Sequence, residues 1–413
     1  MRRWAPALLV IAACAGGRVV TEPQPPQVAP LRFGVDTHVH LTMAQGARPL
    51  FSGEPGSGEL TWNPRVRLKN QLEEAHLRSA GIKLVFGALW PPNATRPGRS
   101  ALDESLDQVD ALAEFTRRRP GFRLVDSAQS AREAVSKGFI AVLPQLEGGE
   151  GITRVEDVDL LYAAGVRCLT VVHFVDTQLG GAAKGQLQKN VLGVRTGENN
   201  PRGLSPLGRA VVQRAMDLGL LLDLSHASEV MMDEVLTMAE ARGVPVINTH
   251  TGARALMDME RNLSGPLAAR LAKGGGLIGV SLYDTQVEVL TGDVLPAHQH
   301  GTCDDVVAHW LELSKVAPPE RVVLGSDLNS FISRARAGGQ CANGLRNASD
   351  LPGLFAALEA NGVPRAALDG MGDEVLRVLE VVEARASPAA RAQALSLRRE
   401  VLRRDSSHFT VGW

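Results

Sequence analysis

Two histidines one residue apart, His38 and His40, close a short apolar stretch near the start of the chain. Side chains alternate between the two faces of a β-strand, so a strand at this place would direct both imidazoles to the same side. Neutral imidazole is a common ligand of zinc and related metals, and such a pair could supply half of a metal site. Taken alone, the motif fits a solvated turn better than a metal site, so its interpretation depends on the residues that follow.

Further side chains that bind metals or transfer protons follow apolar stretches downstream. They are Glu147, His173, His226, His250 and Asp327. A satisfied core polar group or a helix N-cap would explain any one of them, and for His173 alone this is the simpler interpretation. Their shared position at the ends of apolar stretches is not explained in this way. The pattern predicts that they meet at one rim of a sheet, where barrel enzymes place their catalytic groups.

The elements that must position these residues alternate along the chain. Short apolar or β-branched stretches, expected to be strands, alternate with amphipathic stretches, expected to be helices. The expected strands are 31–38, 82–89, 139–146, 168–174, 220–225, 244–249, 277–282 and 322–325. The expected helices include 67–80, 103–119, 155–164, 207–218, 228–242, 265–273 and 304–315. This order predicts an α/β fold with a parallel sheet, and eight strands are the number that closes a (β/α)8 TIM-type barrel; a doubly wound open sheet is the alternative.

The long Gly- and Pro-rich connections all run from an expected strand to an expected helix. They are 41–64, 90–99, 176–206 and 329–349, whereas helix-to-strand turns such as Arg242-Gly243 are short. In a barrel enzyme the strand-to-helix loops form the active face, so this asymmetry favours the barrel. An Arg- and Ala-rich pattern at 387–404 predicts a C-terminal helical extension, either a solvated helix packed on the barrel or a contact with a partner subunit or anionic lipid.

Composition limits the class of partner. The chain has 413 residues, of which 44% are apolar, 22% charged and 4% aromatic, with a formal net charge of −1. This is enough apolar material for one large barrel or two medium domains. The near-neutral charge and the few aromatics provide neither an electrostatic footprint nor a stacking platform for nucleic acid.

The N-terminal segment is expected to direct export. Arg2 and Arg3 precede an apolar run at 7–13 that is too short to span a bilayer and is typical of a secretory signal. Ile11-Ala12-Ala13-Cys14 resembles the lipobox of bacterial lipoproteins, in which the cysteine is lipidated; an ordinary signal peptide is the alternative. Ala15 after this cysteine favours the outer membrane, with the protein on its periplasmic side.

The expected organisation therefore has four parts. They are a signal peptide at 1–13, a lipid-anchor cysteine and Pro-rich tether at 14–30, a barrel that carries the candidate metal site at 31–384 and a helical extension at 385–413. Of the remaining cysteines, Cys168 lies in an apolar run and is expected to be buried. An exported protein could join Cys303 and Cys341 in a disulfide, although sequence alone does not fix the pairing.

Several motifs, in order from about residue 33 to about residue 379, resemble the membrane (renal) dipeptidase family of the amidohydrolase superfamily. The motifs are Leu146-Glu147-Gly148-Gly149, Gly165-Val166-Arg167-Cys168-Leu169-Thr170, Leu204-Ser205-Pro206-Leu207-Gly208, Asp223-Leu224-Ser225-His226-Ala227-Ser228, Thr249-His250-Thr251-Gly252-Ala253-Arg254-Ala255, Arg261-Asn262-Leu263 and Gly325-Ser326-Asp327. The resemblance implies an amidohydrolase-like barrel that hydrolyses dipeptides, including those with D- or dehydro residues. It also implies a homodimer by analogy.

The resemblance further implies a site for two divalent metal ions, with zinc the expected metal. The first ion would bind His38, His40 and Asp327, the second would bind His226 and His250, and Glu147 would bridge them. Two cations that share a water lower its pKa from ~15.7 toward ~7 and so provide a nucleophile at neutral pH.

Three residues would then act on the substrate. Asp327 would accept the proton and return it to the leaving amine. His173 would bind the substrate and stabilise the oxygen of the tetrahedral intermediate, and Arg261 would pair with the terminal carboxylate of a dipeptide.

Two segments depart from the family pattern. His40 stands where the family normally has Asp, which keeps a metal ligand but makes the first site one unit more positive. Leu328-Asn329-Ser330 replaces an aromatic residue, an Asp and a Gly. We expect these changes to affect metal preference or substrate range rather than hydrolysis itself.

Two other functions remain open. A lactonase, amidase or phosphoesterase of the same superfamily would commonly bridge its metals with a carboxylated lysine on the fourth strand, but 171–174 contains no lysine and Glu147 lies on the third. A catalytically inactive, lipid-anchored binding protein would usually have lost a ligand or the proton-transfer residue, and here each of these positions holds a side chain able to coordinate.

Overall fold

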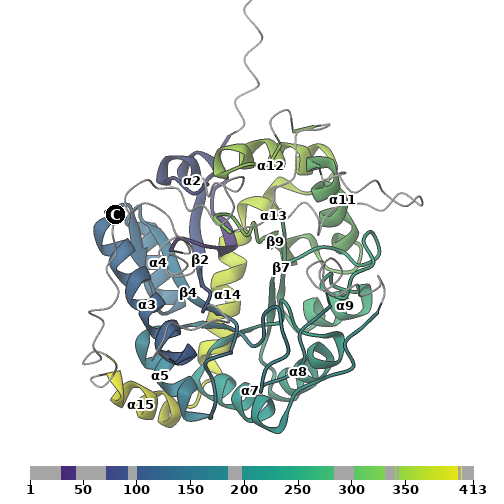
Figure 1. The fold of residues 1–413 in the computed structure, drawn as a ribbon. Coiled ribbons are helices and arrows are strands. Elements are labelled where there is room, and N and C mark those ends of the chain that lie inside the picture. The colour runs from purple at the N-terminus through teal and green to yellow at the C-terminus, as the bar shows by residue number, and fades with distance from the viewer. Residues whose placement is uncertain are drawn as a thin grey trace, which may run out of the picture.

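Parallel strands that close on themselves form the centre of the molecule (Figure 1). The computed structural model describes residues 29–42, 71–91, 100–184, 198–282, 302–330, 340–341, 344–398 and 401. The strands within these ranges are β1 (Gly34–Val39), β2 (Ile82–Leu89), β3 (Phe122–Leu124), β4 (Ile140–Glu147), β5 (Cys168–Thr170), β6 (Leu221–Asp223), β7 (Ile247–Thr251), β8 (Leu277–Val280) and β9 (Val322–Leu324).

The order of the strands closes the barrel. It runs β2-β1-β9-β8-β7-β6-β5-β4-β3 in the described part of the chain, and an additional parallel pairing joins β2 to β4. In that pairing Leu84 lies opposite Ala141 and Leu89 opposite Leu146, so β2 and β4 are in register along most of their length. The (β/α)8 barrel predicted from the sequence is confirmed, and the open sheet is ruled out.

One strand was not predicted. β3 has three residues and pairs with the start of β4, where Phe122 lies opposite Ile140. Further along the same edge of β4, β5 replaces β3 as the pairing strand, and Cys168 lies opposite Gln145. β3 contains Phe-Arg-Leu, and only Phe122 is fully buried, so no continuous apolar run indicates a strand there.

Helices surround the barrel (Figure 1). They are α2 (Glu74–Ala80), α3 (Ala101–Arg118), α4 (Ala128–Ser136), α5 (Glu156–Ala164), α7 (Pro206–Leu218), α8 (Glu229–Arg242), α9 (Gly265–Lys273), α11 (Cys303–Ser314), α12 (Leu351–Ala360), α13 (Arg365–Asp369), α14 (Met371–Ala384) and α15 (Pro388–Ser396), with short 3-10 turns at Pro319–Arg321 and Ala348–Asp350. The expected helix at 67–80 begins later, at Glu74, and its first residues lie outside the described ranges. α4 and α12 to α14 were not among the expected helices.

Side-chain caps set where several helices begin after the loops. Ser100 and Asp103 form a reciprocal capping box on α3, and Thr302 and Asp305 form another on α11. Ser205 accepts a hydrogen bond from the backbone of Gly208 and is followed by a proline, which favours the first turn of α7. These caps fix the point at which each long loop returns to the barrel.

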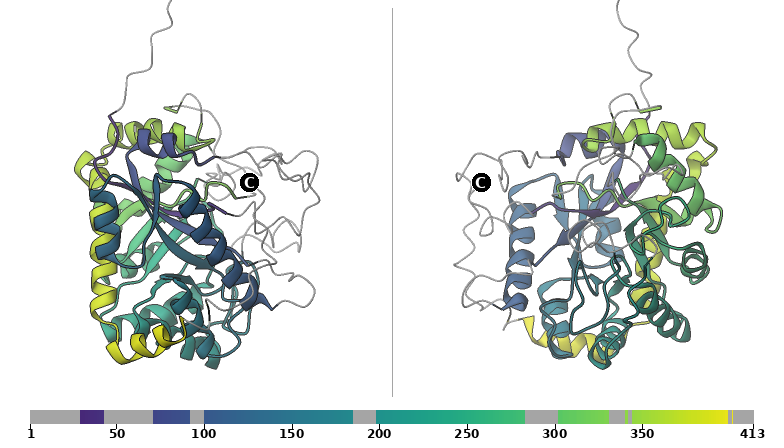
Figure 2. Two further views of the ribbon diagram at one scale, coloured as in Figure 1. Left: turned by 90° about the vertical axis from the view of Figure 1, so that its left-hand side faces the viewer. Right: turned by 45° about the vertical axis from the view of Figure 1, so that its right-hand side comes forward.

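α14 closes the end of the barrel that lies opposite the loops (Figure 2). The backbone N–H of Gly372 donates to the carbonyl of Phe33, just before β1, and Arg377 donates to the carbonyl of Gly275 in the turn before β8. α15 packs on α5 and α7, where Arg391 donates to the hydroxyl of Tyr162. The amino ends of the strands are therefore covered by helix.

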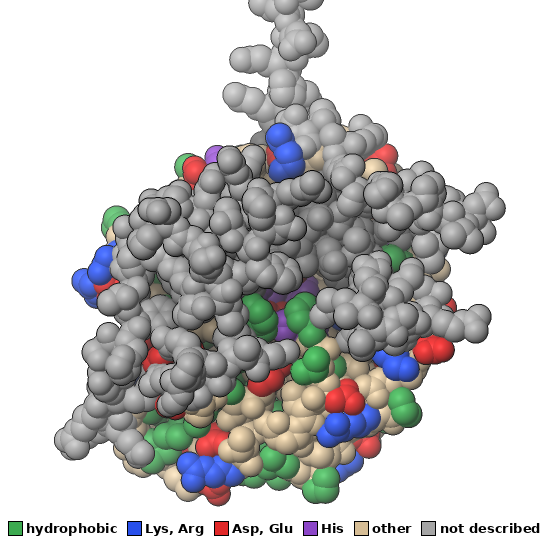
Figure 3. Space-filling view, viewed as in Figure 1, with side chains coloured by type: hydrophobic (Ala, Val, Ile, Leu, Met, Phe, Trp, Pro, Cys, Tyr) green, Lys and Arg blue, Asp and Glu red, His purple; other side chains and the backbone are tan. Residues whose placement is uncertain are grey.

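The opposite face carries the carboxyl ends of the strands. Histidine side chains are visible at the centre of this face, in a hollow bordered by hydrophobic side chains (Figure 3). Within the residues that the structure describes, no helix combines the length and the apolar character needed to cross a bilayer. The expected signal peptide and nearly all of the expected tether fall outside the described residues.

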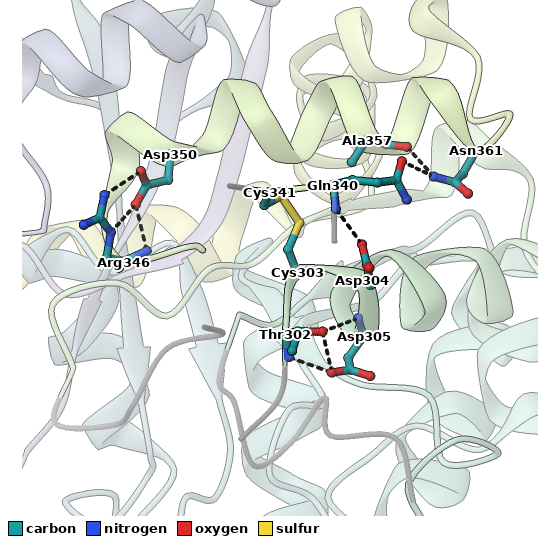
Figure 4. Close-up of a disulfide and its surroundings, with 10 residues drawn as sticks. All are labelled: Thr302, Cys303, Asp304, Asp305, Gln340, Cys341, Arg346, Asp350, Ala357 and Asn361. Atoms are coloured by element: carbon teal, nitrogen blue, oxygen red, sulfur yellow. Dashed lines mark hydrogen bonds and ion pairs between the residues drawn. A yellow bond between two sulfur atoms is a disulfide. The ribbon is translucent and has the colours of Figure 1, made fainter. Parts of the chain in front are cut away.

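A disulfide joins Cys303, the first residue of α11, to Cys341, which precedes α12 (Figure 4). The pairing that the sequence allowed is confirmed. Cys168 is a buried free thiol, as expected, and burial raises the pKa of this thiol well above its usual value.

Candidate metal centre

Three histidines converge on one oxygen of the Glu147 carboxylate. His38 lies on β1 and His250 on β7, whereas His226 follows β6 and Glu147 ends β4. Oε1 of Glu147 is 3.3 Å from Nε2 of His38, 3.2 Å from Nε2 of His226 and 3.6 Å from Nε2 of His250. All four side chains are buried. Residues that are far apart in the sequence thus meet at the carboxyl end of the barrel, as the sequence predicted.

The second oxygen of the same carboxylate faces a different group. Oε2 of Glu147 is 3.6 Å from Nε2 of His40, and that nitrogen is 3.2 Å from Oδ1 of Asp327. Ligand-capable atoms of His38, His40 and Asp327 all lie within 4.8 Å of one another. The imidazole of His40 therefore lies among the ligand-capable atoms of His38, Glu147 and Asp327.

His173 and Arg261 also lie in this centre. Nε2 of His173 is 3.4 Å from Oε1 of Glu147. Arg261 is 9% exposed; its Nη2 donates to Nε2 of His226 at 3.1 Å and its Nη1 donates to the carbonyl of His250 at 3.0 Å. The structure thus brings together all eight residues that the sequence singled out. It also places a ring nitrogen of His173 within 4.8 Å of ligand-capable atoms of Glu147 and His226.

The backbone turns sharply at two of these positions. His226 and Asp327 adopt left-handed conformations, with φ of 68° and 56°, which residues other than glycine seldom adopt. Backbone hydrogen bonds hold both: the N–H of Ala183 donates to the carbonyl of His226, and the N–H of Asp327 donates to the carbonyl of His38. Both residues leave a strand and still point into the barrel mouth.

Burial and charge set the protonation of the centre. Burial raises the pKa of Glu147, but the neighbouring His38 and His173 outweigh it and hold that pKa well below its usual value. Burial lowers the pKa of His38, but the carboxylates of Glu147 and Asp327 outweigh it and raise the pKa to about 9. Burial, aided by the nearby Arg261, lowers the pKa of both His226 and His250. The ionised Glu147 carboxylate thus faces the neutral imidazoles of His226 and His250, the form that binds metals, and the protonated ring of His38.

The residues present fit a divalent cation. Among the described residues, Nε2 of His38 has no hydrogen-bond partner although it is fully buried. Nε2 of His226 and Nε2 of His250 are 3.0 Å apart, and both face Oε1 of Glu147. Imidazole nitrogens with carboxylate oxygens are the donor set that zinc and its neighbours prefer. A cation among these atoms would bind the ring nitrogens and the carboxylate oxygen that otherwise face one another.

Other residues of the centre were missed at the level of sequence. Gln145 lies two residues before Glu147 on β4, so strand alternation places it on the same face and could have indicated it. Asp223 and Thr249 belong to quoted motifs but were given no role. Both carboxyl oxygens of Glu150 are buried without a hydrogen-bond partner in the described part of the chain, and burial raises the pKa of this group.

Comparison with known proteins agrees with this geometry. A family model for membrane dipeptidase (peptidase family M19) matches residues 34–393. This chain belongs to the membrane dipeptidase family. The match covers the barrel and α14 and ends within α15.

Two relatives show how far the family likeness extends. An uncharacterized dipeptidase of Schizosaccharomyces pombe is 30% identical over 285 residues, which are 68% of this chain and 62% of the relative. Dipeptidase 3 of Mus musculus is 26% identical over 323 residues, 78% of this chain and 60% of the relative. The matched segments thus span less than two thirds of the length of these membrane dipeptidase relatives.

Solved structures share the fold. The barrel of a metallo peptidase from Rhodobacter sphaeroides, liganded with a phosphinate mimic of the dipeptide L-Ala-D-Ala, superposes with a TM-score of 0.65 at 20% identity, covering 86% of this chain and 99% of that one. The probable dipeptidase PvdM of Pseudomonas aeruginosa gives a TM-score of 0.66 at 19% identity, covering 86% and 96%. At these identities the likeness establishes a common fold.

Proposed function

We propose that this protein is a metal-dependent dipeptidase that uses two divalent cations, with zinc the expected metal. The observation that carries the proposal is the position of Glu147. One of its oxygens faces His38, His226 and His250, and the other faces His40. A single carboxylate between two sets of ligand atoms is suited to bridge two cations, and membership of the membrane dipeptidase family supports the same reaction.

In this proposal each ligand set belongs to one cation. His38, His40 and Asp327 would hold the first, His226 and His250 would hold the second, and Glu147 would contact both. When bound, the cations supply Lewis acidity, which lowers the pKa of a water molecule from ~15.7 toward ~7.

Side chains of the protein would move the proton and orient the substrate. The Asp327 carboxylate, 7% exposed, would accept the proton of the attacking water and return it to the leaving amine. His173 would donate a hydrogen bond to the oxygen on which negative charge develops. The 3.4 Å distance between Nε2 of His173 and Oε1 of Glu147 supports this role.

Arg261 supports a substrate with a free carboxylate. Burial lowers the pKa of its guanidinium to about 10, so it remains charged at neutral pH. Its hydrogen-bond partners among the described residues are neutral: the His226 ring and a backbone carbonyl. A buried cation without a hydrogen-bonded anion is a binding site for one, and the planar guanidinium matches a carboxylate. This favours dipeptides, including those with D- or dehydro residues, over lactones, simple amides and phosphoesters.

We further propose that the protein is exported and anchored through a lipidated Cys14. The lipobox-like sequence before this cysteine and the Pro-rich segment after it support the proposal. Incorporation of labelled fatty acid that is lost in Cys14→Ser would support it, whereas equal labelling of both forms would contradict it. A homodimer is proposed from family analogy alone, and the molar mass in solution tests it.

The test of the proposed function combines metal analysis with a substrate screen. Purified protein is expected to contain about two equivalents of zinc or a similar metal and to hydrolyse members of a mixed-chirality dipeptide library that includes a dehydrodipeptide. A chelator should abolish the activity and zinc should restore it. Hydrolysis of lactones or phosphoesters but not of dipeptides would favour the other hydrolase class. Absence of bound metal, with no rise in Tm on adding zinc, would favour an inactive binding protein.

A further inference from the structure

A buried carboxylate on β6 lies at the centre of a hydrogen-bonded network beneath the candidate metal centre. Asp223 is 1% exposed. Its Oδ1 accepts from the backbone N–H groups of Ser225 at 3.0 Å and Thr249 at 2.9 Å. Its Oδ2 accepts from Oγ1 of Thr170 at 2.6 Å, Nε2 of Gln145 at 3.0 Å and Oγ1 of Thr249 at 2.8 Å. We call Gln145, Thr170, Asp223 and Thr249 the network layer.

The direction of these hydrogen bonds determines which nitrogen of His250 carries a proton. An ionised carboxylate can only accept hydrogen bonds, so the hydroxyl proton of Thr249 points to Asp223. Oγ1 of Thr249 can then only accept from Nδ1 of His250, which lies 2.9 Å away. The proton of His250 is thereby placed on Nδ1, and its Nε2 keeps a lone pair directed at Glu147 and His226.

The same carboxylate fixes the orientation of the Gln145 amide. Because Asp223 accepts, the amide NH2 of Gln145 must face it, and the amide oxygen Oε1 therefore faces the other way. That oxygen is 3.2 Å from Nδ1 of His38 and accepts its proton. Nδ1 of His38 carries a proton whether the ring is neutral or charged, and Nε2 is the nitrogen available to a metal.

We infer that Asp223 is a positioning residue that places the Nδ1 proton of both His38 and His250, and so directs their Nε2 atoms at the cations. The inference rests on the proposed function in that it requires a cation at this centre. One carboxylate on β6 would thus orient ligands on β1 and β7, one from each of the two proposed metal sites. Partners of this kind commonly change metal affinity 10- to 100-fold.

Two other histidines of the centre lack this link. Nδ1 of His40 and Nδ1 of His173 have no hydrogen-bond partner among the described residues. The His226 ring receives its hydrogen bond from Arg261 on Nε2 instead. The role assigned to Asp223 is therefore specific to His38 and His250.

The substitution Asp223→Asn tests the inference because it should reverse the direction of the hydrogen bonds that link position 223 to the Thr249 hydroxyl and His250. The backbone N–H groups of Ser225 and Thr249 can only donate, so they would hold the new amide oxygen at the position of Oδ1. The new NH2 group would then occupy the position of Oδ2 and donate to the Thr249 hydroxyl. That hydroxyl would turn to donate to Nδ1 of His250, which moves the ring proton to Nε2.

Zinc retention by the full-length, zinc-loaded protein against a competing chelator is the first measurement. We expect Asp223→Asn to keep its circular dichroism spectrum and to bind zinc roughly 10- to 100-fold more weakly. Thr170→Val is the matched control, since the Thr170 hydroxyl bonds to Asp223 and Gln145 of the same network layer and to neither Thr249 nor a histidine ring. It should change zinc affinity by about twofold at most. Wild-type affinity in Asp223→Asn, or an equal loss in the control, would overturn the inference.

The protonation of the His250 ring is the second measurement, and a merely structural role of Asp223 would leave it unchanged. Long-range ¹H–¹⁵N correlation spectra of chelated protein labelled with ¹⁵N-histidine should show the Nδ1–H form in the wild type and the Nε2–H form in Asp223→Asn. The same form in both proteins contradicts the inference.

Two further results keep the proposals separable. Should Asp223→Asn fail to fold, Thr249→Val removes the acceptor of His250 Nδ1 together with one hydrogen bond to Asp223, and it is expected to weaken zinc binding. Unchanged binding would count against the inference. Should the wild type itself bind no zinc, the proposed function fails, whereas the ring spectra still decide whether Asp223 places the proton.

Discussion

Two layers of polar side chains at the carboxyl end of the barrel differ in how far the chain satisfies them. We call the upper layer the rim layer; it consists of His38, His40, Glu147, His173, His226, His250 and Asp327. Three histidines of this layer each have a buried ring nitrogen with no hydrogen-bond partner among the described residues. In the network layer below it, Asp223 alone accepts five hydrogen bonds. Buried polar groups are normally satisfied, so the rim layer is built for a partner that the chain does not supply.

The difference shows how the fold divides two tasks. The network layer is completed by strands β4 to β7 and needs no ligand to be stable. The rim layer places imidazoles and carboxylates within hydrogen-bond distance of one another without pairing all of them. Residues of the rim layer should therefore control metal content and activity. Apart from Arg261, which contacts the rim layer, changes outside both layers should affect neither.

Glu147→Ala should have the largest effect because both cations would lose a ligand at once. We expect the purified variant to retain neither metal and its dipeptidase activity to fall to the level of the solvent blank. Elemental analysis of wild type and variant, prepared side by side, measures the first effect. Full metal content in the variant would rule out the bridging position of Glu147 and remove the distinction between the two layers.

Arg261→Ala should weaken substrate recognition while metal content is kept. Loss of one partner of a buried charge pair costs about 2–5 kcal/mol, so kcat/KM for dipeptides should fall roughly 30-fold to several thousandfold. Dipeptide amides, which lack the carboxylate, should be affected far less. Arg270→Ala is the control, because Arg270 pairs with Asp233 and Glu240 on the outside of the barrel. Equal losses for dipeptides and their amides would remove the assigned role.

His40→Asp should have a smaller effect that sharpens the description of the rim layer. His40 contacts Glu147 and Asp327, and a carboxylate at its position would make the first site one unit more negative. We expect the fold to be kept and the preference among zinc, manganese and cobalt, or the range of dipeptides cleaved, to change. Metal analysis and a parallel substrate screen measure both. Identical profiles would show that the departure from the family pattern is neutral.

Glu150→Gln should have the smallest effect, on stability alone. Burial raises the pKa of Glu150 in the folded protein above the unfolded value of ~4.3. A raised carboxyl pKa contributes stability at pH values below the unfolded pKa, and this contribution is lost as pH rises through the folded pKa. The variant should therefore be more stable than the wild type at pH 7, and the gain should disappear near pH 4. Thermal unfolding at both pH values measures this, and a gain that persists unchanged at pH 4 would contradict it.

The sequence predicted the barrel and the rim layer for a common reason. A strand of a parallel barrel is a continuous apolar run. A residue near its carboxyl end, such as Glu147 or His250, projects toward the same rim as its counterparts on the other strands. Local pattern and position in the chain were therefore sufficient. The Cys303–Cys341 disulfide was a pairing that the sequence allowed but did not fix, and few other cysteines were present.

The network layer could not be predicted because it depends on contacts between strands. Asp223 accepts hydrogen bonds from Gln145 on β4 and Thr249 on β7. These contacts depend on the register of the strands in the barrel, which cannot be read from the sequence. The left-handed backbone at His226 and Asp327 was equally hidden, since nothing in the residue types requires it. Asn329, one of the departures from the family, also has positive φ and exchanges hydrogen bonds with Gln71, a contact across more than two hundred residues.

Anomalous diffraction from zinc-soaked crystals at the zinc absorption edge would test the central claim most directly. We predict two peaks on either side of the Glu147 carboxylate, one beside His38, His40 and Asp327 and the other beside His226 and His250. A single peak, or peaks away from Glu147, would contradict a site in which this carboxylate joins two cations.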